Sequence, residues 1–219
     1  MSQTILSLLV NATLETCYMV ALSTLIATLV GLPLGVVLYV TRKGSILEKK
    51  AVYQVLAAIV NVTRSIPYII LMIAIIPFTR WIVGSSIGTN AAIVPLSLSA
   101  MPFIARIVEN AILEVNKGLI EAATAMGANS MQVITKVLLP ESMPAIINGL
   151  TLTVISLIGY SAMAGAVGGG GLGDLAIRYG YHRFDVKIML ITIIIMVVLV
   201  QIVQSLGDLL AKRYSHGKS

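Results

Sequence analysis

Charged side chains are scarce in this sequence. Only 11% of its 219 residues are Asp, Glu, Lys or Arg, against about 25% in typical soluble domains, while 58% are hydrophobic and the mean hydropathy is +0.97. Several charge-free runs approach the roughly 20 residues that cross a hydrocarbon core of about 30 Å. A small soluble domain cannot bury all of them, so the sequence predicts an integral membrane protein.

Several other features are missing. Cys17 is the single cysteine, which excludes an intrachain disulfide. No Lys or Arg precedes Arg42, so the first apolar run lacks the basic region of a signal peptide and is expected to be retained. The net charge of +6 comes from basic residues scattered at the ends of apolar runs, which argues against nucleic-acid binding. His182 and His216 fall on opposite sides of the predicted membrane, so no metal site is expected.

The sequence also lacks a phosphate-binding loop of the form G-x-x-x-x-G-K-[ST]. No acidic residue falls in the middle of a predicted span, whereas proton- or ion-coupled carriers usually place one there. We therefore expect neither catalytic nor cofactor-binding residues in this chain. The glycine run Gly168–Gly173 follows a predicted span with no strand before it, and we interpret it as a flexible external loop.

Because the apolar runs are continuous rather than alternating, they predict helices and not a closed barrel. We expect an all-α integral membrane protein, one transmembrane domain over residues 1–219 with about five spans. Residues 51–61 are expected to form an approach helix, with Arg64 reaching back to the cytoplasmic interface. The predicted spans cover residues 17–41, 62–79, 91–108, 142–165 and 188–207.

In the first span, Pro33 predicts a kink, and the G-x-x-x-G pattern of Gly31 and Gly35 predicts close helix packing. The pattern fits contact between two copies of the chain as well as contact within one copy.

Five spans place the two termini on opposite sides of the membrane, and the distribution of Lys and Arg predicts which side is which. An external amino terminus leaves four basic residues outside, namely Arg80, Arg178, Arg183 and Lys187. Eleven then face the cytoplasm: Arg42, Lys43, Lys49, Lys50, Arg64, Arg106, Lys117, Lys136, Lys212, Arg213 and Lys218. We therefore expect the amino terminus outside and the carboxyl terminus in the cytoplasm.

This orientation places a polar segment, residues 109–140, in the cytoplasm. Its second half has the pattern of two short helices: an Ala-rich stretch from Glu121 ends at Gly127, and Asn129 with Gln132 has the spacing of a capping box. Pro140 is expected to end the second helix by biasing Leu139 away from helical conformation. An ordinary amphipathic interfacial loop is the alternative interpretation.

From Glu121 to Pro140 this segment has the sequence pattern E-A-A-x3-G-x9-V-L-L-P. It resembles the cytoplasmic EAA loop of permease subunits of binding-protein-dependent ABC importers, with Val137 where Ile is commoner. The likeness extends over roughly Leu25 to Ile195 and is closest to the methionine uptake branch. The supporting strings are Gly35–Arg42, Arg64–Pro67, Ile76–Arg80, Pro102–Arg106 and Gly159–Met163.

The resemblance implies that the loop docks into a groove on an ABC ATPase subunit. It assigns the coupling role to Glu121, Ala122, Ala123, Met126, Gly127, Ala128, Leu139 and Pro140. It further implies two ATPase subunits that use ATP and Mg, an external substrate-binding lipoprotein, and residence in the cell inner membrane. Another importer branch, for polar amino acids or osmolytes, stays an alternative, as does a channel or secondary carrier.

Five helices are few to enclose a passage, which favours a homodimer with the pathway on its two-fold axis. In the fourth span, Tyr160, Ser161 and Met163 are candidate gate residues, because Met is an adaptable apolar plug and Tyr and Ser offer polar contacts. Simple helix packing is the alternative for these three. The expected mechanism is alternating access, driven by closure of the partner ATPases.

Overall fold

The computed structural model describes residues 3–216. Within that range the regular elements are all helical, which confirms the all-α prediction. Residues 1–2 and 217–219, among them the predicted cytoplasmic Lys218, lie outside the described part. The helices are α1 (Gln3–Thr41), α2 (Lys50–Ser65), α3 (Tyr68–Ala74), α4 (Ile76–Val83), α5 (Thr89–Leu113), α6 (Lys117–Ala125), α7 (Ser130–Val133), α8 (Leu139–Ala166), α9 (Gly171–Leu175) and α10 (Val186–His216), with π-helical segments Ile134–Leu138 and Ala176–Tyr181.

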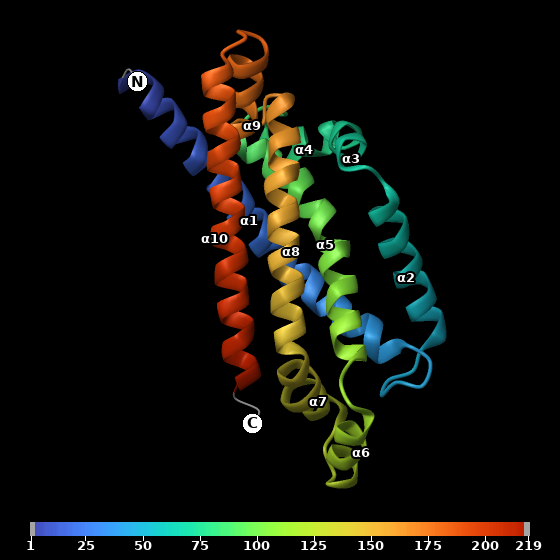
Figure 1. The fold of residues 1–219 in the computed structure, drawn as a ribbon. Helices are drawn as coiled ribbons and strands as arrows, with labels where there is room; N and C mark the ends of the chain where they lie inside the picture. Colours follow the sequence, from blue (N-terminus) through green and yellow to red (C-terminus); the bar gives the residue numbers. More distant parts are fainter. Residues whose placement is uncertain (1–2, 217–219) are drawn as a thin grey trace.

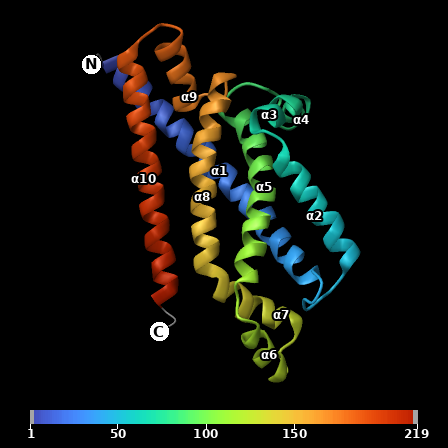
Figure 2. The same cartoon turned by 45° about the vertical axis from the view of Figure 1, so that its right-hand side comes forward.

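Four helices among the described residues are long and apolar enough to cross a membrane, and α2 with α3 makes a fifth span if this bent pair is counted as one. In both views α1 crosses obliquely behind α8 and α5, which run side by side (Figures 1 and 2). The amino-terminal end lies with α3, α4 and α9 at one end of the bundle, while α6, α7 and the carboxyl-terminal end lie at the other.

Helix α1 begins at Gln3 and is therefore longer than the predicted span 17–41. Apolar residues lie on both sides of the few polar residues that precede Cys17, so the helix extends past them. Pro33 lies inside it. Its glycines bring it against α5: a Cβ at Gly31 would lie 2.8 Å from the carbonyl oxygen of Met101, and one at Gly35 only 2.5 Å from that of Ala105. The G-x-x-x-G pattern therefore serves contact within one copy of the chain.

The predicted second span, residues 62–79, does not form one helix, because it takes in the end of α2, all of α3 and the first half of α4. The helix that runs along α5 is α2, which ends at Ser65, and α3 leaves it at an angle of 101° (Figure 1). Pro67 explains the break, because the residue before a proline avoids helical conformation and Ile66 is extended, with φ −81° and ψ 122°. Arg64 consequently lies at the α3 end of α2, beside Phe103 of α5, and not at the end of the bundle that carries α6 and α7, which we expected to face the cytoplasm.

Helix α5 contains Pro95 and Pro102, continues through both without a break, and covers the predicted span 91–108.

The prediction that a helix ends at Pro140 was wrong, because Leu139 is helical, with φ −64° and ψ −49°. Its N–H donates to the carbonyl of Ile134, five residues earlier. This wider π turn accommodates a proline that has no N–H, so the helical path continues from Ser130 to Ala166.

The glycine run is not the flexible loop that we expected. It begins α9, in which Gly171, Leu172 and Gly173 are buried. The Gly171 N–H donates to the carboxylate of Glu15 at 2.7 Å, and the Leu172 N–H donates to the Thr16 hydroxyl at 2.9 Å. Glycine is required because a Cβ at Gly173 would lie 2.4 Å from the carbonyl oxygen of Ala162. Glu15, expected outside the first span, thus lies within α1 and holds this segment.

Candidate coupling elbow and passage face

The segment of residues 117–140, here called the elbow, consists of α6, a reversal and the helical path that begins with α7. Asn116 caps α6 by accepting a hydrogen bond from the Gly118 N–H at 2.9 Å. At the other end Gly127 has φ +83°, the Ala128 N–H donates to Ala123 O at 3.0 Å, and the Gly127 N–H donates to Thr124 O at 2.9 Å. These two bonds form a Schellman motif, so Gly127 ends α6 as predicted.

The predicted capping box is present at the start of α7. The Gln132 N–H donates to the side chain of Asn129 at 2.9 Å, and the Asn129 N–H donates to the side chain of Gln132 at the same distance. Both contacts are local in the sequence, and together with the glycine they fix the angle between α6 and α7.

The elbow separates its side chains into two groups. Ala123 is buried, Ala128 and Leu139 are half-buried, and they face the rest of the chain. The exposed members of the predicted coupling set are Glu121, Ala122, Met126, Gly127 and Pro140. Figure 1 places α6 and α7 at the extreme end of the molecule, beyond the long helices.

Two methionines are the most exposed large apolar side chains of the elbow. The side chain of Met126 is 83% exposed and that of Met131 is 66% exposed. Such exposure of large apolar groups at the tip of a molecule is typical of a surface that binds another protein. Met131 was not among the residues predicted for coupling, although its place in the first turn of α7, between the capping-box residues Asn129 and Gln132, puts it beside the reversal.

The candidate gate residues on α8 do not lie together. Tyr160 is half-buried and Met163 is 46% exposed, and their spacing of three residues puts them on one face of the helix. Ser161 is buried, and its hydroxyl donates to the carbonyl of Ile158 at 2.7 Å. The structure thus assigns Ser161 to packing inside the subunit and leaves Tyr160 and Met163 on a shared face.

Aromatic contacts connect this face to the second span. The ring of Tyr68 on α3 stacks on Tyr160, with centroids 4.7 Å apart and planes at 5°. The guanidinium of Arg64 lies over the ring of Phe103 on α5, with its carbon atom 4.8 Å from the ring centroid. Phe103 and Tyr160 line one shallow hollow together with Ser99 and Ser156. We call the exposed surface around these side chains the passage face.

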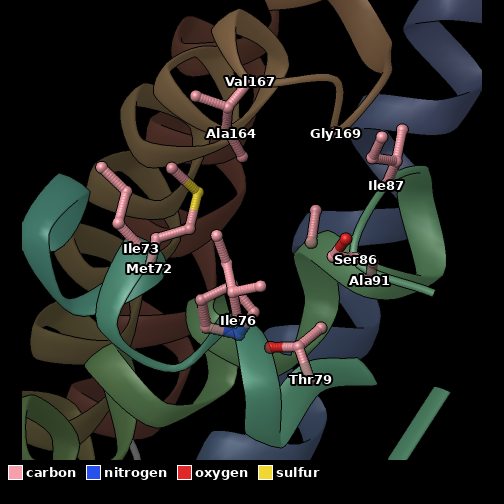
Figure 3. A pocket seen from close by; sticks show the side chains of 12 residues that line it. Met72, Ile73, Ile76, Thr79, Ser86, Ile87, Ala91, Ala164, Val167 and Gly169 are labelled. Carbon is pink, nitrogen blue, oxygen red and sulfur yellow. The ribbon is translucent and has the colours of Figure 1, made fainter. Parts of the chain in front are cut away.

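A second cavity, of about 260 Å³, lies among α3, α4, α5 and the segment after α8 (Figure 3). Met72, Ile76 and Val167 give it an apolar wall, and the hydroxyl groups of Thr79 and Ser86 are its polar side chains. No charged residue lines it. Across residues 3–216, no cluster of three or more His, Cys, Asp or Glu side chains is placed to hold a metal ion.

Comparison with known proteins gives the same architecture. The family model described as "Binding-protein-dependent transport system inner membrane component" matches residues 31–216. The "Probable D-methionine transport system permease protein MetI" of Vibrio cholerae serotype O1 is 54% identical over 209 residues, which is 95% of this chain and 93% of that protein. Its namesake in Pasteurella multocida is 56% identical over 205 residues, or 94% of each.

Among solved structures, a chain of the inward facing MetNI methionine ABC transporter superposes with a TM-score of 0.96 at 50% identity. The match covers 98% of this chain and 99% of that one. A chain of an amino acid ABC transporter with histidines superposes at 0.79, with 20% identity and 94% of each chain covered, which is a likeness of fold.

Proposed function

We propose, from the premise that this chain belongs to the binding-protein-dependent transport system inner membrane component family, that it is the permease subunit of an ABC importer for methionine. The observation that carries the proposal is the match over 98% of the chain to a methionine ABC transporter subunit at 50% identity. Relatives at 54% and 56% identity whose printed names specify D-methionine transport support the same cargo.

The elbow is the proposed coupling element. Its exposed Met126 and Met131 supply apolar contact area, and Glu121 adds a negative charge for a basic partner. Ala122 and Gly127 have no large side chains, so that the elbow can enter a groove on the ATPase closely. Buried Ala123, half-buried Ala128 and Leu139, and the following Pro140 join this surface to α8, which transmits its movement to the passage face.

The complete importer is proposed as a homodimer of this chain in the cell inner membrane, with two cytoplasmic ABC ATPases and an external substrate-binding lipoprotein. The elbow and the carboxyl terminus then face the cytoplasm, in agreement with the excess of Lys and Arg near that end. ATP and Mg are used by the partner subunits. This chain contributes no catalytic group of its own.

Transport follows alternating access in this proposal. ATP draws the paired ATPases together, the two elbows move inward, and the bundles open to the outside to receive cargo from the docked lipoprotein. Hydrolysis returns the bundles to the inward-facing arrangement. Tyr160 and Met163, on the passage face, are the proposed gate, since both are available to a second copy across the two-fold axis.

Co-purification with the ATPase and lipoprotein, followed by ATP hydrolysis and uptake of radiolabelled methionine in proteoliposomes, tests the proposal. We expect hydrolysis to depend on this chain and uptake to require all three components. Glu121→Lys should weaken ATPase binding and lower uptake, because it reverses the charge at the proposed contact. Glu114→Lys, an exposed charge reversal outside the elbow, is the matched control.

Two outcomes would contradict the proposal. Methionine uptake by this chain without an ATPase would indicate a carrier or channel instead. Equal ATPase binding by the Glu121→Lys and Glu114→Lys chains would show that Glu121 is not part of the coupling surface.

A further inference from the structure

Arg64 lies beside the middle of a membrane-spanning helix. Its guanidinium contacts the ring of Phe103, which is 14 residues after Thr89 and 10 before Leu113, the two ends of α5. At 1.5 Å per residue these separations are about 21 Å and 15 Å. A contact at this depth places the cation well inside the bilayer and away from either interface.

A guanidinium at this depth requires a polar environment. Exposure of Arg to hydrocarbon near the bilayer centre costs several kcal/mol, so such residues face a protein interior or an aqueous passage and mark functional sites. Arg64 is exposed in the single chain. The ion pairs found in the described part of the chain, Arg106 with Glu109 and Arg178 with Asp174, do not involve it. Arg64 therefore presents an uncompensated positive charge on the passage face.

The groups around Arg64 also favour a small polar ligand. Phe103 shares its hollow with the hydroxyl-bearing side chains of Ser99 and Ser156 and with Tyr160. Tyr68, which stacks on Tyr160, is 6% exposed, and its hydroxyl is buried without a hydrogen-bond partner. A buried hydroxyl without a partner is costly unless a ligand or a second conformation satisfies it.

We propose that Arg64, held over the ring of Phe103, binds the carboxylate of the amino acid cargo inside the passage, while the face of Tyr160 that Tyr68 now covers receives its ammonium group once the two tyrosines separate. Arginine suits this role, since its planar fork matches a carboxylate and its charge does not titrate. Aromatic rings attract cations on their faces. The inference rests on the proposed function and deepens it by assigning where the cargo is held.

The cavity of Figure 3 fits the same path. Pro95 in its wall lies eight residues before Phe103 on α5, and Val167, directly after the end of α8, lies seven residues after Tyr160. The cavity is therefore about 10 to 12 Å closer to the α3 and α9 end than Arg64. Because the hollow beside Arg64 measures only about 10 Å³ here, cargo reaches the guanidinium when the stacked tyrosines separate.

The test uses the complete importer in proteoliposomes during ATP turnover, with a methionine analogue that carries a diazirine in its side chain. After illumination, mass spectrometry counts crosslinks on this chain separately from those on the ATPase and the lipoprotein. We expect crosslinks within α5 or α8 that are competed by methionine and not by methioninol, which lacks the carboxylate. Arg64→Gln should reduce them roughly tenfold, the scale of one charge-assisted hydrogen bond, and Arg64→Lys should reduce them less.

Arg42→Gln is the matched control, since Arg42 is an exposed arginine that directly follows the end of α1 and lies outside the passage face and the cavity of Figure 3. It should leave the crosslinks unchanged. Cargo-free ATP hydrolysis verifies that each variant still assembles. Equal crosslinking in the Arg64→Gln importer, equal competition by methioninol, or active uptake with no crosslink on this chain would each overturn the site while the proposed function stands. Failure of the unaltered importer to take up methionine would instead overturn the proposed function.

Discussion

At Gly127 the chain adopts φ +83°, and a Cβ added there meets no atom within 4 Å. Replacement by alanine is therefore not obstructed by neighbours and is penalised by the backbone alone, by about 1–2 kcal/mol for an L-residue in left-handed conformation. We predict that Gly127→Ala opens the reversal between α6 and α7 and weakens ATPase binding by up to about tenfold. Titration of the purified ATPase against this chain in nanodiscs measures the effect.

Gly127→Asn is the control for that variant, because asparagine enters the left-handed region more easily than alanine. It should retain most of the affinity. If the alanine and asparagine chains bind the ATPase equally well, the left-handed turn does not determine docking.

Residue-scale features of the elbow were predictable from the sequence because they are local. Gly127, Asn129 and Gln132 act on neighbours within five residues, and the structure confirms the predicted helix end at Gly127 and the predicted capping box. The placement of Arg64 was not predictable, since its contact with Phe103 joins residues 39 positions apart and depends on the direction of α2. The burial of Ser161 likewise depends on which face of α8 packs inward.

At the scale of helices, the contact between α1 and α5 depends on glycine. A Cβ at Gly35 would lie 2.5 Å from the Ala105 carbonyl oxygen and 2.6 Å from Val108 Cβ, and the backbone atom cannot move aside. We predict that Gly35→Ala destabilises the protein by roughly 1–3 kcal/mol through overpacking. Thermal unfolding in detergent, followed by far-UV circular dichroism, measures the loss.

The matched control is Gly159→Ala on α8, where the added Cβ meets nothing within 4 Å. Alanine favours helix over glycine by up to about 1 kcal/mol, so this variant should melt at the same temperature as the parent or higher. A Gly35→Ala chain that melts at the same temperature as the parent would show that the α1–α5 contact tolerates a methyl group.

Continuous apolar runs predicted the helices α1, α5, α8 and α10, because length and composition suffice for them. The break within residues 62–79 was not predicted, because the sequence offers two apolar segments that each fall short of a full crossing. Pro67 divides them, and packing of α2 against α5 decides which one runs alongside the bundle. The π turn before Pro140 was also missed, since a proline signals a helix end as readily as a widened turn.

At the scale of the whole molecule, the passage face needs a second copy. Met163 is 46% exposed on the face that carries Tyr160, and the proposed two-fold axis brings the two copies of this face together. We predict that Met163→Cys, in a Cys17→Ser chain because Cys17 is itself exposed, crosslinks to its counterpart with a short bifunctional maleimide in the nucleotide-free importer. Trapping with ATP and vanadate should reduce the crosslink, since the gate then opens outward.

Tyr214→Cys in the same background is the control, because this residue is 53% exposed in the last turn of α10, beyond the predicted span 188–207 and therefore accessible from water. It should react with a monofunctional maleimide and give no crosslinked dimer in either state. A crosslink at Met163 that is equally abundant with and without trapped nucleotide would show that the two copies meet at this residue but that it does not move as a gate. Dimerisation would stand in that case, and the gate would have to be sought elsewhere along the passage face, first at Tyr160 and its stacked partner Tyr68.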